Sequence, residues 1–178
     1  MNKLVIILAG LSIIVFNGSS QTLTKNEVDE FTGHKIKITS YEVLSQTFKV
    51  SAFVSIRNID DTVNILQLKL MLGAMAEVHS IDKGASLYLK LTDGQVIQLK
   101  NMEYAISCTG CGARGFSGSG AQGTQTFYEL TSEQSEKLAQ TPIDKIRITT
   151  NSGYVDQEIR GARASVIKDE FAIIKLWK

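Results

Sequence analysis

Apolar residues recur at every second position through the middle of the chain. This two-residue period is typical of β-strands that bury one face. It predicts strands over residues 48–56, 66–72, 87–91 and 102–106. Their apolar positions are Phe48, Val50, Ala52, Val54, Ile56, Leu66, Leu68, Leu70, Leu72, Leu87, Leu89, Leu91, Met102, Tyr104 and Ile106.

Turn signals separate these segments. Residues 58–61, Asn-Ile-Asp-Asp, predict a turn between the first two strands. The pair Asp93-Gly94 favours a tight hairpin whose second strand covers residues 96–99. Residues 151–153, Asn-Ser-Gly, predict a later hairpin. Its strands are expected near residues 144–149 and 154–159, and two others near residues 35–39 and 126–130.

Two segments have helical patterns. Thr131 and Gln134 have the spacing of a capping box, which predicts a helix start. This helix should end near Gln140, because Pro142 disfavours helical geometry in the preceding residue. The second helix begins near Ser165, and an alternative for residues 172–177 is a final strand. Its apolar stripe consists of Ile167, Phe171 and Ile174.

The N-terminus has the three parts of a secretory signal peptide. Lys3 precedes an apolar run over residues 4–16, and small polar residues follow at 17–20. The run is shorter than the ~20 residues that span a bilayer. We expect cleavage near Ser20 and export to the periplasm or the extracellular space, with no transmembrane segment in the mature chain. The alternative is a retained anchor or a buried core helix.

The elements together predict an α+β fold, a mainly antiparallel β-sheet with about two helices packed on it. The alternative is a β-sandwich with a C-terminal helix. No repeat of fixed period and no long linker interrupts the chain. With residues 1–20 as the signal peptide, we expect residues 21–178 to form a single globular α+β domain, a length that suits one core.

Composition narrows the function classes. The chain has 19 basic and 18 acidic residues, and loss of Lys3 would balance them. A neutral surface argues against nucleic acid as a partner, since that binding needs a basic face. An exported protein would also lack access to ATP and NAD. The one tryptophan, Trp177, lies at the C-terminal end, which disfavours a sugar platform, although five tyrosines remain.

Residues 107–124 lack any period and hold six of the 14 glycines and both cysteines. Long loops of this kind are usually functional or disordered. Outside the cytosol, Cys108 and Cys111 are expected to form a local disulfide that stabilises the fold by only ~2 kcal/mol. Redox or metal chemistry and unbonded thiols are the alternatives. A catalytic Cys-x-x-Cys normally lies at a helix N-terminus, which this sequence does not predict.

The same segment offers candidate contact residues. Arg114 is its only charged residue and Phe116 its only large apolar one, so these two are the candidate partner-binding side chains. Residues 110–115 also match the dinucleotide fingerprint G-x-G-x-x-G. No helix start follows them, and that motif needs one to hold the pyrophosphate.

No catalytic constellation is found. His34 and His79 are expected on the surface rather than as general bases, and they are too distant in sequence from the cysteines to predict a zinc site. We therefore expect no metal, no cofactor and no enzymatic activity. The sequence favours a small exported binding or accessory module of the bacterial envelope or surface, with an unknown protein or envelope component as partner. The alternative is a thiol–disulfide or metal-binding protein that uses Cys108 and Cys111.

Overall fold

The computed structural model describes residues 21–73, 77–109 and 121–177. In chain order the strands are β1 (Leu23–Val28), β2 (Lys35–Thr39), β3 (Glu42–Gln46), β4 (Val50–Ile59), β5 (Val63–Leu72), β6 (Ser80–Ile81), β7 (Ser86–Leu91), β8 (Val96–Lys100), β9 (Ala105–Ile106), β10 (Cys108–Thr109), β11 (Gln122–Leu130), β12 (Ile143–Thr150) and β13 (Gly153–Glu158). The helices are α1 (Ser132–Gln140) and α2 (Val166–Leu176), the second preceded by a 3₁₀ turn at Gly161–Ser165.

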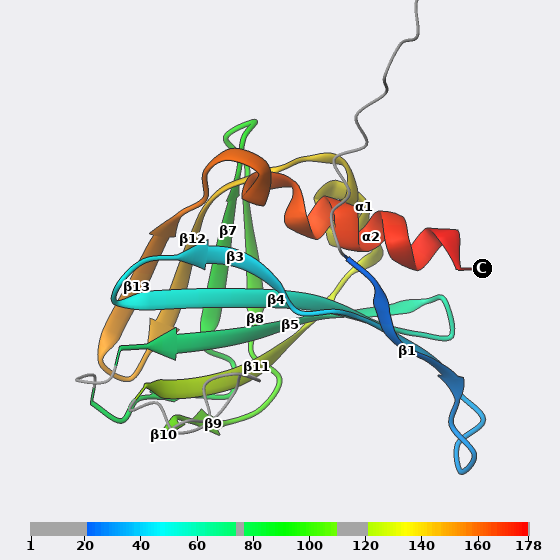
Figure 1. Cartoon of the computed structure of the whole chain (residues 1–178), viewed down its shortest axis with the longest axis horizontal. Coiled ribbons are helices and arrows are strands. Elements are labelled where there is room, and N and C mark those ends of the chain that lie inside the picture. Colours follow the sequence, from blue (N-terminus) through cyan, green and yellow to red (C-terminus); the bar gives the residue numbers. More distant parts are fainter. Residues whose placement is uncertain (1–20, 74–76, 110–120, 178) are drawn as a thin grey trace, which may run out of the picture.

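A seven-stranded antiparallel sheet, the large sheet, forms the front layer in Figure 1. Its order is β1-β2-β4-β5-β11-β10, and β3 also pairs with β4. The long strands β4 and β5 pair over their whole length, from Val50 opposite Leu72 to Ile59 opposite Val63. The predicted turn between them is confirmed at residues 60–61, whereas Asn58 and Ile59 still belong to β4. Asp60 and Asp61 both have positive φ there, a conformation that short polar side chains tolerate.

A four-stranded antiparallel sheet in the order β13-β12-β7-β8 lies behind the large sheet, and its strands cross those of β4 and β5 steeply (Figure 1). Both predicted hairpins are confirmed. Gly94 has a φ of 87° between β7 and β8, and Gly153 one of 119° where the turn enters β13. A glycine at each position avoids the steric strain of a positive φ.

The two helices lie next to each other at one end of the sheets, and α2 crosses β2, β3 and β4 (Figure 1). The capping box is confirmed, since Thr131 Oγ1 accepts the Gln134 N–H at 3.2 Å and Gln134 Oε1 accepts the Thr131 N–H at 3.0 Å. Residues 172–176 are helical, so the alternative of a final strand is wrong. The helix buries Ile167, Phe171 and Ile174, as its apolar stripe predicts.

The core lies between the two sheets and under α2. Apolar residues of both sheets and both helices form one buried cluster around Tyr128, which has no exposed surface. Members from the sheets include Val54, Ile56, Leu66, Leu68, Leu87, Leu89, Ile146 and Ile148. Antiparallel sheets with two helices packed against them confirm the α+β fold.

Several local predictions are wrong. Phe48 lies in the turn before β4 and is fully exposed. Met102 and Tyr104 are not in a strand, and with Ile106 they face solvent rather than the core. The buried side chain of Asn101 causes the difference, because its amide donates to the carbonyl of Asp82 at 3.1 Å and to that of Glu103. The chain here pairs with β11 only at an isolated bridge between Asn101 and Tyr128, so no continuous strand forms over residues 102–104.

Candidate binding site at the base of the glycine-rich segment

Strands β10 and β11, on either side of residues 110–120, pair with each other, and we call this pair the base. Cys108 pairs with Gly123 and Thr109 with Gln122, so β10 and β11 hold the two ends of this segment side by side. The prediction that residues 107–124 are all aperiodic is therefore wrong at both ends. Cys108 is exposed on β10, whereas Cys111, Arg114 and Phe116 lie outside the described residues. The disulfide and the contact roles of Arg114 and Phe116 stay predictions.

Buried polar side chains support this base. His79 is only 3% exposed, so its predicted surface position is wrong. Its backbone N–H donates to Ser107 Oγ at 2.9 Å, and the Ser107 N–H donates to its carbonyl oxygen at 2.8 Å. Gln122 Nε2 donates to Thr109 Oγ1 at 3.0 Å. These bonds fix the chain before β10 against the start of β11.

The imidazole of His79 contacts β11 through Thr124. Burial lowers the pKa of His79, with the backbone of Glu77 opposing the shift, so the ring is neutral near pH 7. Thr124 Oγ1 lies 2.6 Å from Nε2, and a neutral ring can accept the hydroxyl proton there. No ion pair of the described residues includes His79, and both side chains are buried. The pair lacks the access and the orienting carboxylate of a catalytic dyad.

A surface hollow of about 410 Å³ lies beside this base. Its lining consists of Glu103, Tyr104, Ala105, Ile106, Cys108, Gly123, Thr124, Gln125 and Phe127. Tyr104 is 58% exposed and Ile106 is 57% exposed, and the neighbouring Met102 also faces solvent. Tyr104 and Ile106, which the alternating pattern predicts to be buried, are thus apolar side chains of the surface. They precede the predicted partner-binding residues in the sequence. We call Tyr104, Ile106, Gln125 and Phe127 the base surface.

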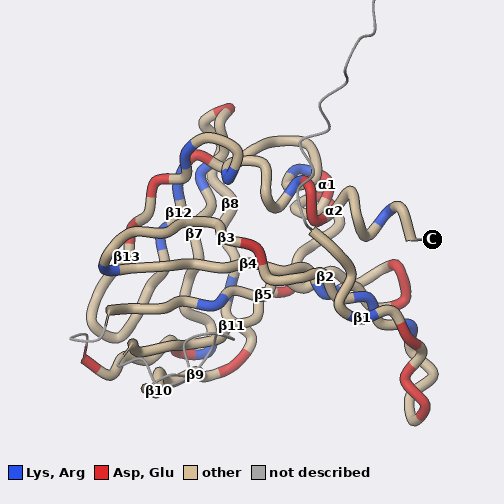
Figure 2. The backbone as a smooth tube through the Cα atoms, viewed as in Figure 1, with Lys and Arg blue, Asp and Glu red and all other residues tan. Residues whose placement is uncertain are grey.

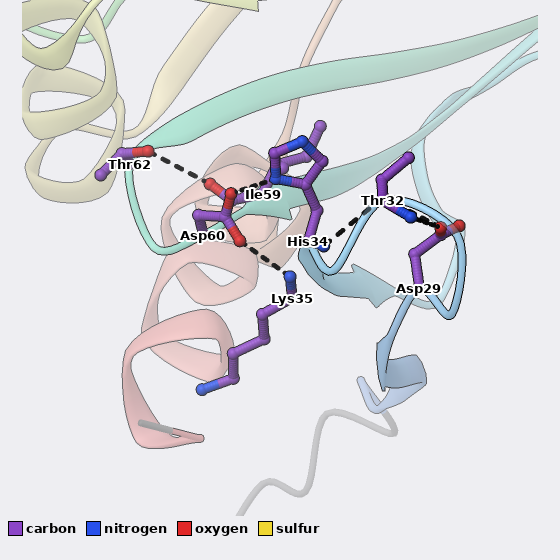
Figure 3. Close-up of polar contacts among 7 residues, drawn as sticks. All are labelled: Asp29, Thr32, His34, Lys35, Ile59, Asp60 and Thr62. Carbon is purple, nitrogen blue, oxygen red and sulfur yellow. Dashed lines mark hydrogen bonds and ion pairs between the residues drawn. The ribbon is translucent and has the colours of Figure 1, made fainter.

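A second polar cluster joins the turn between β1 and β2 to the turn between β4 and β5 (Figure 3). Figure 2 shows acidic positions in both turns. His34 Nδ1 lies 2.5 Å from Asp60 Oδ2, and the Lys35 N–H donates to Asp60 Oδ1 at 2.8 Å. These two donors lower the pKa of Asp60, the backbone N–H more strongly. The hydroxyls of Thr32 and Thr62 bond to acceptors in their own turns. His34 is exposed, as expected, and it joins two turns without facing a nucleophile.

The chain matches no protein-family model, no curated protein and no solved structure. Within residues 21–73, 77–109 and 121–177, no helix is both long and apolar enough to cross a membrane, and no group of three or more potential ligand residues could hold a metal ion. Support for a function therefore comes from the geometry of the hollow and from the predicted export.

Sequence reasoning missed the side chains that form the base surface. Tyr104 and Ile106 were predicted as core positions, and Gln125 and Phe127 were not singled out. The one available signal was the polar residue Asn101 just before the apolar alternation, because a buried amide needs carbonyl partners that a regular strand does not leave free.

Proposed function

We propose that the protein is a small exported, non-enzymatic binding module that contacts a partner protein through the base surface. The exposure of Tyr104 and Ile106 around one hollow is the observation that supports this most. Contiguous exposed apolar side chains often mark interaction sites, and tyrosine is enriched in interfaces. The rigid β10–β11 base holds the hollow in place.

The predicted contact residues Arg114 and Phe116 lie in the sequence between β10 and β11, the two strands next to this hollow. They remain candidate contacts for the same partner. A protein partner fits best, because Phe116, Tyr104 and Ile106 offer apolar area and Arg114 offers a guanidinium for a carboxylate.

Site-specific photocrosslinking in the producing cell tests the proposal. A crosslinker at position 104 should capture one envelope protein, and the same crosslinker at the exposed Phe31 should not. The purified partner should then bind a Tyr104→Ala, Ile106→Ser variant at least about tenfold more weakly, because two interface side chains are lost. Equal capture at both positions, unchanged affinity, or a full-length chain soluble in the cytoplasm would contradict the proposal.

The alternative thiol–disulfide function has a separate readout. Cys108 lies on a strand and not at a helix N-terminus, where a catalytic Cys-x-x-Cys normally lies. Insulin reduction by the purified protein, abolished by Cys108→Ser, would favour that alternative over the binding module.

A further inference from the structure

The outer face of the four-stranded sheet carries an open hollow of about 330 Å³. Its lining consists of Tyr88, Lys90, Val96, Lys145, Ile146, Arg147 and Tyr154. Both helices contact the large sheet, and in the part of the chain that the structure describes no helix packs against this outer face. The hollow has three cationic side chains and two tyrosines in its lining, and no acidic side chain.

The register of the sheet brings the cations together. Lys90 on β7 lies directly opposite Lys145 on β12, and Arg147 follows on the same face two residues along β12. Like charges directly opposite each other in a sheet are unfavourable. Each lysine has an acidic ion-pair partner, Asp144 at 3.4 Å from Lys90 and Asp156 at 3.6 Å from Lys145. An ammonium carries three N–H donors, so both groups still keep donors for an anion.

The guanidinium of Arg147 is held in one orientation. Its Nε and Nη2 each donate to the Asp156 carboxylate at 2.7 Å, and the group lies 5.1 Å from the centre of the Tyr154 ring. Two of its five N–H donors are used in this way, which leaves the others for a ligand. A side chain fixed before binding loses less conformational entropy when a ligand arrives.

Two aromatic rings flank the cations. Tyr88 on β7 and Tyr154 on β13 lie on either side of β12, separated by two strand spacings and by two residues along β12, which together amount to roughly 12 Å. Tyr154 is 68% exposed. The hydroxyl of Tyr88 accepts a bond from Gln98 Nε2 at 3.2 Å. An aromatic ring can stack on the C–H face of a sugar, and Tyr154 keeps for this the ring face that Arg147 does not cover.

We propose that this face, the tyrosine–arginine face, binds an acidic saccharide. The carboxylate of the sugar lies against Arg147, Lys90 and Lys145, and the pyranose rings lie against Tyr88 and Tyr154. That carboxylate accepts from the N–H donors that Asp144 and Asp156 leave free on these three side chains. The site is separate from the base surface, so it stands independently of the protein partner.

The proposal revises one expectation. The scarcity of tryptophan disfavoured a sugar platform, but two tyrosines that are distant in sequence lie on the two strands that flank β12. Balanced total charge also gave no sign of an anion site. The lining of the hollow is nevertheless cationic, because Asp144 and Asp156, the ion-pair partners of its lysines, are not part of that lining.

Calorimetric titration with short oligomers of galacturonate, hyaluronate and alginate tests the site. At least one should bind at low ionic strength, and added salt should weaken it because exposed charges are screened. Tyr154→Ala and Lys90→Gln should each lower the affinity about tenfold, the usual scale for a lost charged or aromatic contact. The methyl ester of galacturonate oligomers, which lacks the charge, should bind at least about tenfold more weakly than the acid form.

Matched variants control for general effects. Lys168→Gln changes an exposed lysine on α2, and Tyr104→Ala removes an exposed tyrosine of the base surface. Lys168→Gln should not change saccharide affinity, whereas Tyr104→Ala shows whether the two surfaces act independently, and thermal melting checks that all variants fold. Absence of binding to all three oligomers, equal affinity for acid and ester, or an equal loss in Lys168→Gln would overturn the proposal. Equal binding to inorganic phosphate or anionic phospholipid vesicles would also overturn it in favour of a general anion site.

Discussion

At the residue scale, Glu170 is the most unusual side chain of the described structure. It lies on α2 with no exposed surface, and neither carboxyl oxygen has a hydrogen-bond partner among the described residues. Burial raises the pKa of Glu170 to about 8, and nearby Glu42 and Asp169 push it in the same direction. The hydroxyl of Thr39 opposes this shift, but it bonds to the backbone of Ile56. The acid therefore stays protonated under α2 near pH 7.

The raised pKa predicts that stability falls as pH rises. The unfolded chain releases the Glu170 proton near pH 4.5, whereas the native state keeps it until about pH 8. Between pH 4.5 and pH 8 the native state binds more protons at Glu170 than the unfolded chain does. The stability that this proton contributes is therefore fully present below pH 4.5 and is lost as the pH rises to 8. Glutamine does not ionise, so Glu170→Gln should remove this fall in the free energy of unfolding. At pH 8 the variant should be more stable than the original protein by about 1–4 kcal/mol. Urea unfolding at pH 5 and pH 8 measures it, and parallel stability curves for both proteins would contradict it.

At the element scale, the start of α1 depends on one side-chain exchange. Thr131→Ala removes the acceptor for the Gln134 N–H and should lower the free energy of unfolding by about 1 kcal/mol. Thr141, at the other end of the same helix, caps it only through its backbone N–H. Thr141→Ala is therefore the matched control and should stay within about 0.5 kcal/mol of the original protein. Chemical denaturation of both variants measures the effect, and equal losses would show that the cap is not responsible.

The elements that local sequence determines were predictable. The capping box, the Asp93-Gly94 turn and the Asn-Ser-Gly turn each depend on a few adjacent residues, and the structure has all three. The Asn-Ser-Gly turn itself is one residue shorter than predicted, because Gly153 already pairs with Thr150, and this register places Arg147 opposite Asp156. The short edge strand β1 was missed, because most of its residues are exposed and show no burial period.

What local sequence does not determine is the pairing between distant strands. The cations of the tyrosine–arginine face meet only because β7 pairs with β12, and Lys90 and Lys145 are far apart along the chain. An alternating pattern also does not say which face is buried, so Tyr104 was assigned to the core. Buried Ser55 and Gln67 show the same limit. They lie on the polar side of the alternation, yet a hydrogen bond of 3.0 Å between them makes their burial tolerable.

At the scale of the whole molecule, the two sheets and both helices share one buried cluster. No boundary within that cluster would let one sheet melt alone, so residues 21–178 should unfold as one cooperative domain. Leu89 lies in the four-stranded sheet and is 1% exposed, whereas Trp177 follows α2 and is 55% exposed. The two positions report on opposite parts of the fold.

Leu89→Ala tests this cooperativity. Truncation of a buried leucine should lower the free energy of unfolding by about 2–5 kcal/mol, because it removes apolar contacts and leaves a cavity. If the core is shared, Trp177 fluorescence and the far-ultraviolet circular dichroism of the strands should shift together to the same lower midpoint. Val63→Ala, at a half-exposed strand end, is the control and should move both midpoints little. A Trp177 transition that keeps its original midpoint while the strand signal shifts would show that α2 and the four-stranded sheet belong to separate folding units.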